Sequence, residues 1–426
     1  MTIIVFLGSL LAAMALGIPI AYSLLVSGVA LMIQLGSFDS QILAQNVIEG
    51  SNSFPLLAVP FFMLAGEIMN VGGLSRRIVN LALTLVGHVR GGLGYVAIIA
   101  ACLMAALSGS AVADTAALAA LLLPMMVAAG HTPARSGGLI ASAGIIAPII
   151  PPSIPFVIFG VAAGVSVKKL FLAGIVPGLL MGVSIALTWW LLARNEGRTP
   201  PPKATMAVRM NALRESTWAL VLPLIVLFGL KFGWFTPTEA AVVAAVYALV
   251  VAMLVYREMS LRQLYEVFVS AGKTTAVVMF LVAAAMVSSY LITVAQIPDQ
   301  MVGLLQPFMG SPTLLLIVIM LLVMAVGTAM DMTPTILILT PVLVPVVKAA
   351  GIDPIYFGVL FVMNNAIGLV TPPVGTVLNV VAGVGKMKMD DVTKGVVPFM
   401  VAEFAVMFLL VFFPALVTVP ARWFSG

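Results

Sequence analysis

Two aspartates, Asp114 and Asp331, stand alone inside long uncharged stretches, each beside small residues and hydroxyl groups. The first lies in SGSAVADT, residues 108–115, and the second in GTAMDMTP, residues 327–334. An aspartate at bilayer depth costs about 2.5 to 3.5 kcal/mol on insertion scales. Each carboxylate therefore needs a partner, and hydroxyls and free carbonyls are oxygen ligands suited to a small hard cation. The two stretches predict two sodium sites, although a protonatable aspartate alone could carry H+.

The composition is that of an integral membrane protein. Hydrophobic residues make up 62% of the 426 residues and charged residues only 8%, whereas soluble domains have about 25% charged residues. At about 20 apolar residues per crossing, the chain has room for about a dozen membrane segments. The 20 Lys and Arg residues exceed the 15 Asp and Glu residues, but they are scattered in short loops, as membrane topology requires. We therefore expect an all-α, multi-pass membrane protein in a lipid bilayer, with no nucleic-acid partner.

Each aspartate belongs to a predicted re-entrant hairpin. The hairpins are expected at about 93–129 and about 312–349, because each consists of two apolar runs of about 15 to 18 residues with a polar break between them. Such runs are short for a full crossing. Irregular backbone at membrane depth is tolerated only where it is buried in protein or lines a cavity.

Two longer apolar runs are interrupted by prolines. The run at about 136–166 contains PIIPPS, residues 148–153, and the run at about 355–384 contains GLVTPPVGT, residues 368–376. We predict two broken transmembrane helices, which pair the positive N-termini of half-helices with free carbonyl groups. A third interruption, Gly17-Ile18-Pro19, is expected to divide the first apolar run into two helices.

The two halves of the chain are related. Shifting the sequence by 221 positions aligns residues 118–177 with 339–398 without a gap, with 16 identities in 60 that include prolines and glycines. We predict a first repeat at 1–193, a cytoplasmic linker at 194–215 and a second repeat at 216–426.

The cations predict the orientation of the repeats. With the linker inside, 15 Lys and Arg residues fall on the cytoplasmic side and five outside, as the positive-inside rule expects. The outer five are Lys168, Lys169, Lys231, Lys348 and Arg422. The base of the first hairpin carries cations and that of the second does not, so the repeats are predicted to be inverted.

These motifs resemble the large membrane subunit of the tripartite ATP-independent periplasmic (TRAP) transporters. The resemblance runs from GIPIAYSL at 17–24 to the C-terminal helix and includes SGSAVADT, PIIPPS, GTAMDMTP and VTPPVG. It implies sodium-driven uptake of a small organic acid across the bacterial inner membrane. It also implies a periplasmic substrate-binding protein and a small four-helix membrane subunit. No small-subunit sequence is fused at the N-terminus, so a separate chain is expected to supply it.

The resemblance also implies which residues bind the transported ions, which are expected to be two or more Na+. By position they are Ser108, Ser110, Asp114, Gly327, Asp331, Thr333, Thr371, Gly375 and Thr376. The first break has Pro148 and Ser153 where the second has Leu369 and Val374, so the two ion sites need not be equivalent.

Substrate is expected near the midplane between the two hairpin tips, at Ser153, Pro152 and Pro373. Its carboxylate would face half-helix N-termini and bound cations. The chain is also similar to ion-coupled transporters that work as elevators, in which a hairpin-bearing core moves against a fixed scaffold. The scaffold is expected to include the arms at 54–71 and 274–297.

Other functions fit the sequence less well. An aspartyl protease would pair its two aspartates, but both lie beside helix breaks and Asp331 lacks a Gly-x-Gly lead. No Gly-rich phosphate loop is present for ATP hydrolysis, so no enzyme is predicted. A passive channel and a stand-alone Na+- or H+-coupled carboxylate carrier of the same fold remain alternatives.

Three other acids and the single cysteine are interpreted structurally. Glu67, Glu239 and Glu403 lie nearer the ends of their apolar segments, where snorkelling or a structural hydrogen bond is expected. Cys102 lies in an apolar run and excludes a disulfide within the chain.

Overall fold

Helices build all the regular structure of this protein in residues 2–194 and 201–425, the part of the chain that the computed structural model describes. Eight of these helices are long and apolar enough to cross a membrane, which confirms the predicted all-α polytopic class. The elements are α1 (Thr2–Ala15), α2 (Ile20–Gln34), α3 (Ser40–Ser51), η1 (Phe54–Leu57), α4 (Ala58–Val71), α5 (Leu74–Val86), α6 (Gly92–Ser108), α7 (Ala111–Ala128), α8 (Pro133–Gly144), α9 (Ile154–Ala163), α10 (Val167–Ala193), α11 (Met206–Lys231), α12 (Pro237–Val250), η2 (Val251–Val255), α13 (Leu261–Val294), α14 (Ile297–Leu305), η3 (Gln306–Phe308), α15 (Pro312–Gly327), α16 (Met332–Ala349), α17 (Pro354–Gly368), α18 (Thr376–Gly385), α19 (Met389–Phe412) and α20 (Ala415–Ser425).

The first apolar run is divided as the sequence predicts. Helix α1 ends at Ala15 and α2 begins at Ile20. Gly17 has a φ of +80°, in the left-handed region that glycine adopts without steric cost. Pro19 then stands at the N-cap of α2, where a missing backbone N–H costs nothing.

Helix pairs form at both predicted hairpins. Helices α6 and α7 are joined by Gly109 and Ser110, and α15 and α16 are joined by residues 328–331. Ser110 caps α7 through its Oγ, which accepts from the amide of Ala113 at 3.4 Å. The re-entrant placement of these pairs in a bilayer stays a prediction.

The two predicted broken helices also occur, as α8 with α9 and α17 with α18. Both first halves begin with a side-chain cap followed by proline, which favours a helix start. Thr132 precedes Pro133 in α8, and Asp353 precedes Pro354 in α17. The Pro151–Pro152 and Pro372–Pro373 peptide bonds inside the breaks are both cis.

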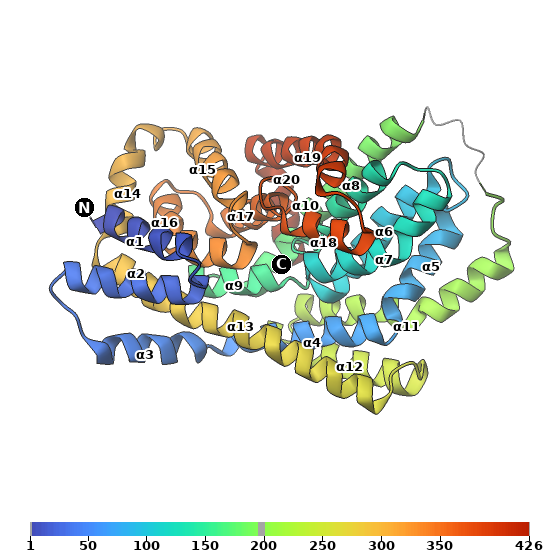
Figure 1. Ribbon diagram of the computed structural model, residues 1–426, viewed down its shortest axis with the longest axis horizontal. Coiled ribbons are helices and arrows are strands. Elements are labelled where there is room, and N and C mark those ends of the chain that lie inside the picture. The colour runs from blue at the N-terminus through green and yellow to red at the C-terminus, as the bar shows by residue number, and fades with distance from the viewer. Residues whose placement is uncertain (1, 195–200, 426) are drawn as a thin grey trace.

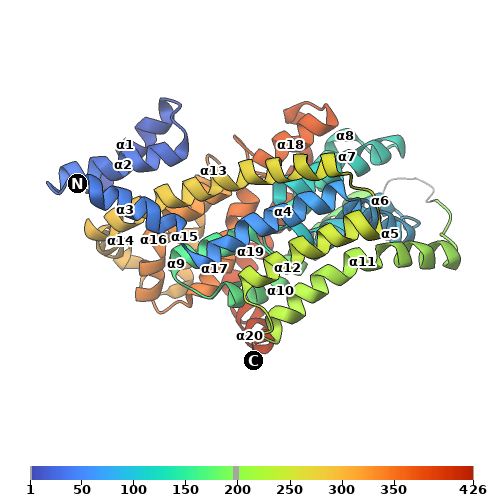
Figure 2. The same cartoon turned by 90° about the horizontal axis from the view of Figure 1, so that it is seen from below.

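The hairpin helices lie on opposite sides of a central group. In Figure 1, α15 and α16 lie to the left and α6 and α7 to the right, with α10 and α19 between them. The long helices α4, α12 and α13 lie side by side along one face (Figure 2), and α4 packs against both of the others. The order hairpin, broken helix, long helix thus occurs twice, in α6–α10 and α15–α19. Inversion of one repeat relative to the other stays a prediction.

Part of the predicted linker is helical. Helix α11 begins at Met206, so the last ten residues of the 194–215 segment belong to it. The reason is local: the Thr205 Oγ1 accepts from the amide of Val208 at 3.4 Å and caps the helix. Residues 195–200 of the predicted linker lie outside the described residues.

A polar cluster ties α5 to the connection between η2 and α13. The Glu258 carboxylate accepts from Arg77 at 2.7 Å and from Arg76 at 3.0 Å. The Arg77 guanidinium also lies 3.7 Å from the centre of the Tyr256 ring. Hydrogen bonding from Arg77 lowers the pKa of Glu258 below its ordinary value.

This cluster predicts a pH-dependent contribution to stability. Because the folded-state pKa of Glu258 lies below the unfolded value of about 4.3, its stabilisation is present above that pH and is lost as the pH falls through the folded value. We expect Glu258→Gln to lower the unfolding free energy by about 1 kcal/mol at neutral pH, since Glu258 is partly exposed. Thermal unfolding across acidic and neutral pH measures this. A difference between the two proteins that does not shrink in acid would contradict the prediction; Glu266→Gln, in the exposed pair with Arg262, is the matched control.

Candidate functional site

The tip of the first hairpin is built by three consecutive residues. Ser108 ends α6, Gly109 follows with a φ of +62°, and Ser110 caps α7. A Cβ on Gly109 would overlap the carbonyl oxygen of Pro152 and lie 3.1 Å from the Cα of Ser153. Only glycine therefore allows this tip to rest directly on the break between α8 and α9.

Asp114 lies one turn into α7 and is almost completely buried, with 1% of its surface exposed. Its Oδ1 accepts a hydrogen bond from the Ser108 Oγ at 2.5 Å, whereas its Oδ2 has no hydrogen-bond partner among the described residues. The Ser108 Oγ in turn accepts from the amide of Ser110 at 3.2 Å. The structure thus brings together all three residues predicted for the first ion site. It leaves one carboxylate oxygen available for a ligand.

The break between α8 and α9 is shielded from solvent. All its residues from Pro148 to Ser153 are buried. The Ser153 Oγ donates to the carbonyl of Pro148 at 2.5 Å and accepts from the amide of Phe156 at 3.2 Å. In this conformation Pro152 and Ser153, two of the predicted substrate residues, are therefore buried and support the tip.

The second tip also rests on its broken helix. A Cβ on Gly368 would lie 2.9 Å from the carbonyl oxygen of Gly327, so the two backbones meet at these glycines. The amide of Val374 donates to the carbonyl of Thr328 at 3.3 Å, from the break to the tip. The same relation between tip and break therefore recurs in the second half.

The residues of the second predicted site are more open than those of the first. Asp331 and Pro373 are exposed, and Thr333 and Thr376 are half-buried. Gly375 turns the chain into α18 with a φ of +48° and places Thr376 at the first position of that helix. The two halves of the molecule thus differ in access: the first site is sealed and the second is exposed.

Thr371 points away from this group. Its hydroxyl donates to the carbonyl of Ile367 at 2.8 Å and approaches the sulfur of Met400 on α19 at 3.5 Å. The Thr371 hydroxyl is therefore directed toward another helix, away from the other predicted ligands of the second site.

Two buried polar side chains at the tips have no counterpart in the sequence prediction. The Thr115 Oγ1, next to Asp114, has no hydrogen-bond partner among the described residues and lies against Gly144 of α8. The Asn365 Oδ1 on α17 likewise has none and faces Gly327. Gly144 and Asn365 match under the shift of 221 positions, since 144 plus 221 is 365. The sequence signal for Asn365 was the Asn364-Asn365 pair inside an apolar run.

A small cavity separates the first tip from the long helices of the opposite face. It has a volume of about 70 Å³ and is lined by Met63, Gly66, Glu67, Ser108, Ser110, Ala113, Ile154, Ala271 and Thr274. Pockets that bind small molecules have volumes of about 300 to 1,000 Å³, so this cavity is far smaller than a ligand pocket. A Cβ on Gly66 would lie 3.1 Å from the Ser108 Cβ, which shows how closely α4 meets the tip.

Two of the three acids that were interpreted structurally behave as expected. Glu239 accepts from the amide and hydroxyl of Thr236, both at 2.8 Å, and Glu67 accepts from the Ser270 hydroxyl at 3.3 Å. The expectation for Glu403 was wrong. That side chain is completely buried, and neither of its carboxylate oxygens has a hydrogen-bond partner among the described residues.

Comparison with known proteins gives consistent similarities over the whole chain. The model of the tripartite ATP-independent periplasmic transporter DctM component matches residues 7–416. The chain is 56% identical over 425 residues to the 2,3-diketo-L-gulonate TRAP transporter large permease protein of Escherichia coli, and the match covers 100% of both chains. It is 38% identical over 410 residues to the sialic acid TRAP transporter large permease protein of Vibrio cholerae, with 96% of each chain covered.

A solved structure shares the fold. The crystal structure of the Alcanivorax borkumensis YdaH transporter matches with a TM-score of 0.64 at 15% sequence identity, covering 90% of this chain and 88% of that one. At this identity the similarity concerns the fold alone.

Proposed function

Because the chain belongs to the DctM component family of tripartite ATP-independent periplasmic transporters, we propose that it is the large permease of a sodium-coupled organic-acid uptake system. The resemblance noted in the sequence is thereby confirmed. The family and the eight candidate spans make it a multi-pass protein of the bacterial inner membrane. The family is one of transporter permeases, not of enzymes.

The proposed substrate is a small carboxylate. Similar permeases are named for 2,3-diketo-L-gulonate, for sialic acid and, at 38% identity over 402 residues, for C4-dicarboxylates in Pseudomonas aeruginosa. All three names describe organic acids. Neither tip stretch, 108–115 or 327–334, contains an arginine or lysine to bind such an anion.

The observation that carries the sodium proposal is the geometry of Asp114. A buried carboxylate needs neutralisation, and here one oxygen is hydrogen-bonded to Ser108 while the other lacks a protein partner. Sodium at this oxygen, with the Ser110 and Thr115 hydroxyls nearby in sequence, would supply the missing charge. The second site is proposed at Asp331 and Thr376, with Gly327, Thr333, Gly375 and Asn365 contributing oxygen atoms from the tip and the broken helix.

Binding order follows from the same charges. A carboxylate substrate placed between two ionised aspartates is repelled, and this repulsion is strong where the dielectric constant is low. Sodium therefore binds first and substrate second. This order couples uptake to the sodium gradient.

The proposed motion is an elevator. The two hairpins and broken helices would move together past the scaffold arms at 54–71 and 274–297, which fall mainly in α4 and α13. The narrow cavity between the first tip and these arms supports this: it must widen before an organic acid can reach Ser108 and Ser110.

The proposed partners come from the family. A periplasmic binding protein would deliver the substrate, and a separate small four-helix subunit would complete the membrane unit. Uptake that does not depend on a binding protein would instead favour a stand-alone Na+- or H+-coupled carrier of the same fold.

Sodium-dependent uptake in proteoliposomes tests the function. With both partners present, uptake of a radiolabelled organic acid is expected to require an inward sodium gradient, and an equal potassium gradient should not replace it. Asp331→Ala is expected to lower uptake and to raise the sodium concentration needed for half-maximal rate, because a cation ligand is lost. Unchanged sodium dependence in this variant would count decisively against the second site; Asp390→Asn, an exposed change on α19, is the control.

A further inference from the structure

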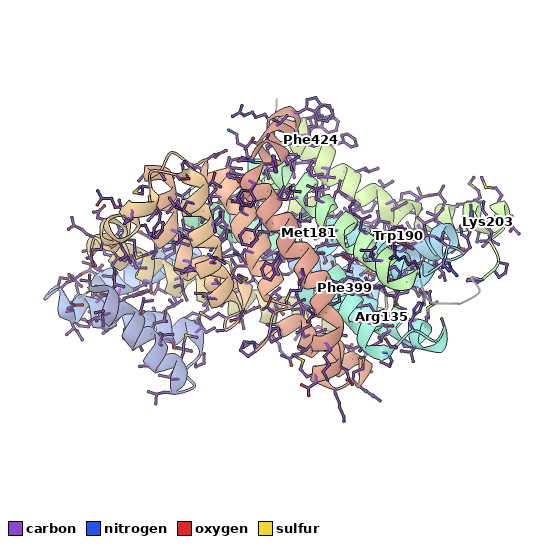
Figure 3. The ribbon with its side chains drawn as sticks, turned by 90° about the horizontal axis from the view of Figure 1, so that it is seen from above. Arg135, Met181, Trp190, Lys203, Phe399 and Phe424 are labelled. Carbon is purple, nitrogen blue, oxygen red and sulfur yellow. The ribbon has the colours of Figure 1, made fainter. Side chains whose placement is uncertain are left out.

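Glu403 lies deep inside the membrane portion of the molecule. It follows the first residue of α19 by 14 positions and precedes the last by nine. At 1.5 Å per residue, these separations are about 21 Å and about 13 Å. None of its surface is exposed. Figure 3 shows Phe399, one turn before Glu403, part-way along α19, with Phe424 toward one end of the molecule and Arg135 toward the other.

Neither carboxylate oxygen of Glu403 has a basic partner within residues 2–194 and 201–425. Helix α19 packs against α8, α10, α15, α17, α18 and α20. The titratable or charged residues of these helices are Arg135, Lys168, Lys169, Tyr356 and Arg422, and α19 itself adds Asp390, Asp391 and Lys394.

These groups lie toward the ends of α19. The amide of Arg135 is next to Gly395, eight residues before Glu403, and so about 12 Å away along the helix. The Tyr356 hydroxyl donates to the carbonyl of Leu410 at 2.8 Å, seven residues beyond Glu403, or about 10 Å along the helix. Lys169 and Arg422 line one cavity with Tyr356 and belong to the same end.

The repeat register predicts an apolar neighbour for Glu403. Its counterpart in the first half is Gly182, since 182 plus 221 is 403. A Cβ on Gly182 would meet the Cys102 sulfur at 2.9 Å and the Ile146 Cδ1 at 3.8 Å. Ile146 corresponds under the same shift to Ile367 of α17. Glu403 is thus an acid that the first half lacks, at a position expected to face α17.

A carboxylate in this setting must be neutralised. An ionised carboxyl group in an apolar interior is far too costly without a partner. A metal cation needs several oxygen ligands, and the residues three and four positions from Glu403 on α19, Phe399, Met400, Val406 and Met407, have no oxygen in their side chains. A proton needs only the carboxylate itself.

We propose that Glu403 is a proton-binding site in the membrane interior, separate from the two sodium sites. It carries its proton in the packing seen here and exchanges it only when α19 separates from a neighbouring helix and water enters. The inference goes beyond the proposed function because it requires neither sodium coupling nor a particular substrate.

Infrared difference spectroscopy on the full chain in lipid nanodiscs tests the site. At neutral pH, one component of the protonated-carboxyl band is expected to be lost in Glu403→Gln, which keeps the shape of the neutral acid. Glu266→Gln, at an exposed carboxylate of α13, should leave the band unchanged. A band that Glu403→Gln leaves intact overturns the proposal. In heavy water the wild-type component should shift slowly, and an immediate shift overturns the sealed site.

A second variant does not depend on the spectroscopic assignment. Glu403→Met keeps the length of the side chain and removes both oxygens. Since a neutral acid without a partner contributes no ion pair, the thermal unfolding temperature should stay the same or rise. A marked fall would mean that a partner holds the carboxylate, and this would overturn the proposal. Both readouts are independent of transport, so they decide on Glu403 even if Asp331→Ala leaves sodium dependence unchanged.

Discussion

Replacing Asp114 by asparagine is expected to abolish sodium-dependent uptake. The substitution keeps the shape of the side chain but removes the negative charge from a group with 1% exposure. Loss of one member of a buried charge pair costs about 2 kcal/mol or more. At 1.4 kcal/mol per tenfold change, sodium affinity should fall by about 30-fold or more. Uptake in proteoliposomes at varied sodium concentration measures this change.

Asp114→Asn should also differ from the wild type in how sodium affects its thermal stability. Sodium that binds only the folded state raises the unfolding temperature in proportion to its affinity. The wild-type chain should therefore gain thermal stability from sodium relative to potassium, and Asp114→Asn should lose this gain. Without sodium the variant should be at least as stable as the wild type, because it no longer buries an uncompensated charge. A variant that keeps the full sodium-induced gain would remove Asp114 from the site.

Replacing Gly138 by alanine is expected to produce a large loss of stability. Gly138 of α8 faces Gly395 of α19, where an added Cβ would overlap the backbone carbonyl group. The two helices come from different halves of the chain and cannot separate without disturbing other contacts. Overpacking of this kind costs about 3 kcal/mol. Thermal unfolding of the purified chain in detergent or nanodiscs measures the effect.

Gly272→Ala is the matched control for this prediction. Gly272 lies within α13, and an added Cβ there would meet nothing within 4 Å. Alanine should stabilise that helix by about 0.5 to 1 kcal/mol relative to glycine. The two identical chemical changes are thus expected to have opposite signs. Equal effects would mean that α8 and α19 are not in backbone contact.

The sequence predicted the local breaks well because each has a local cause. Glycine at positive φ and proline without an N–H act within a few residues, so the division at Gly17 and Pro19 could be read directly. The same applies to the helix starts at Pro133 and Pro354. Helices α3, α5 and α14 were not predicted as separate elements. They carry enough polar residues to lack a continuous apolar run.

The site was predictable only in part. Ser108, Ser110 and Asp114 are close in sequence, and one helix turn is enough to bring them together. Thr371 looked equivalent to Thr376, yet it faces Met400 on a distant helix. Asn365 and Thr115 belong to the tips through contacts with glycines that lie more than 25 residues away in the chain. No spacing rule reaches across such a separation.

By itself the sequence determined the membrane environment, the helix breaks and the position of the acids at them, because hydropathy, proline and glycine act locally. The tertiary structure decided which polar groups share a site, that the first site is sealed and the second exposed, and that Glu403 is buried without a partner. The physical reason is that burial and pairing depend on helices packed from distant parts of the chain. The free energy of a charge depends on those neighbours.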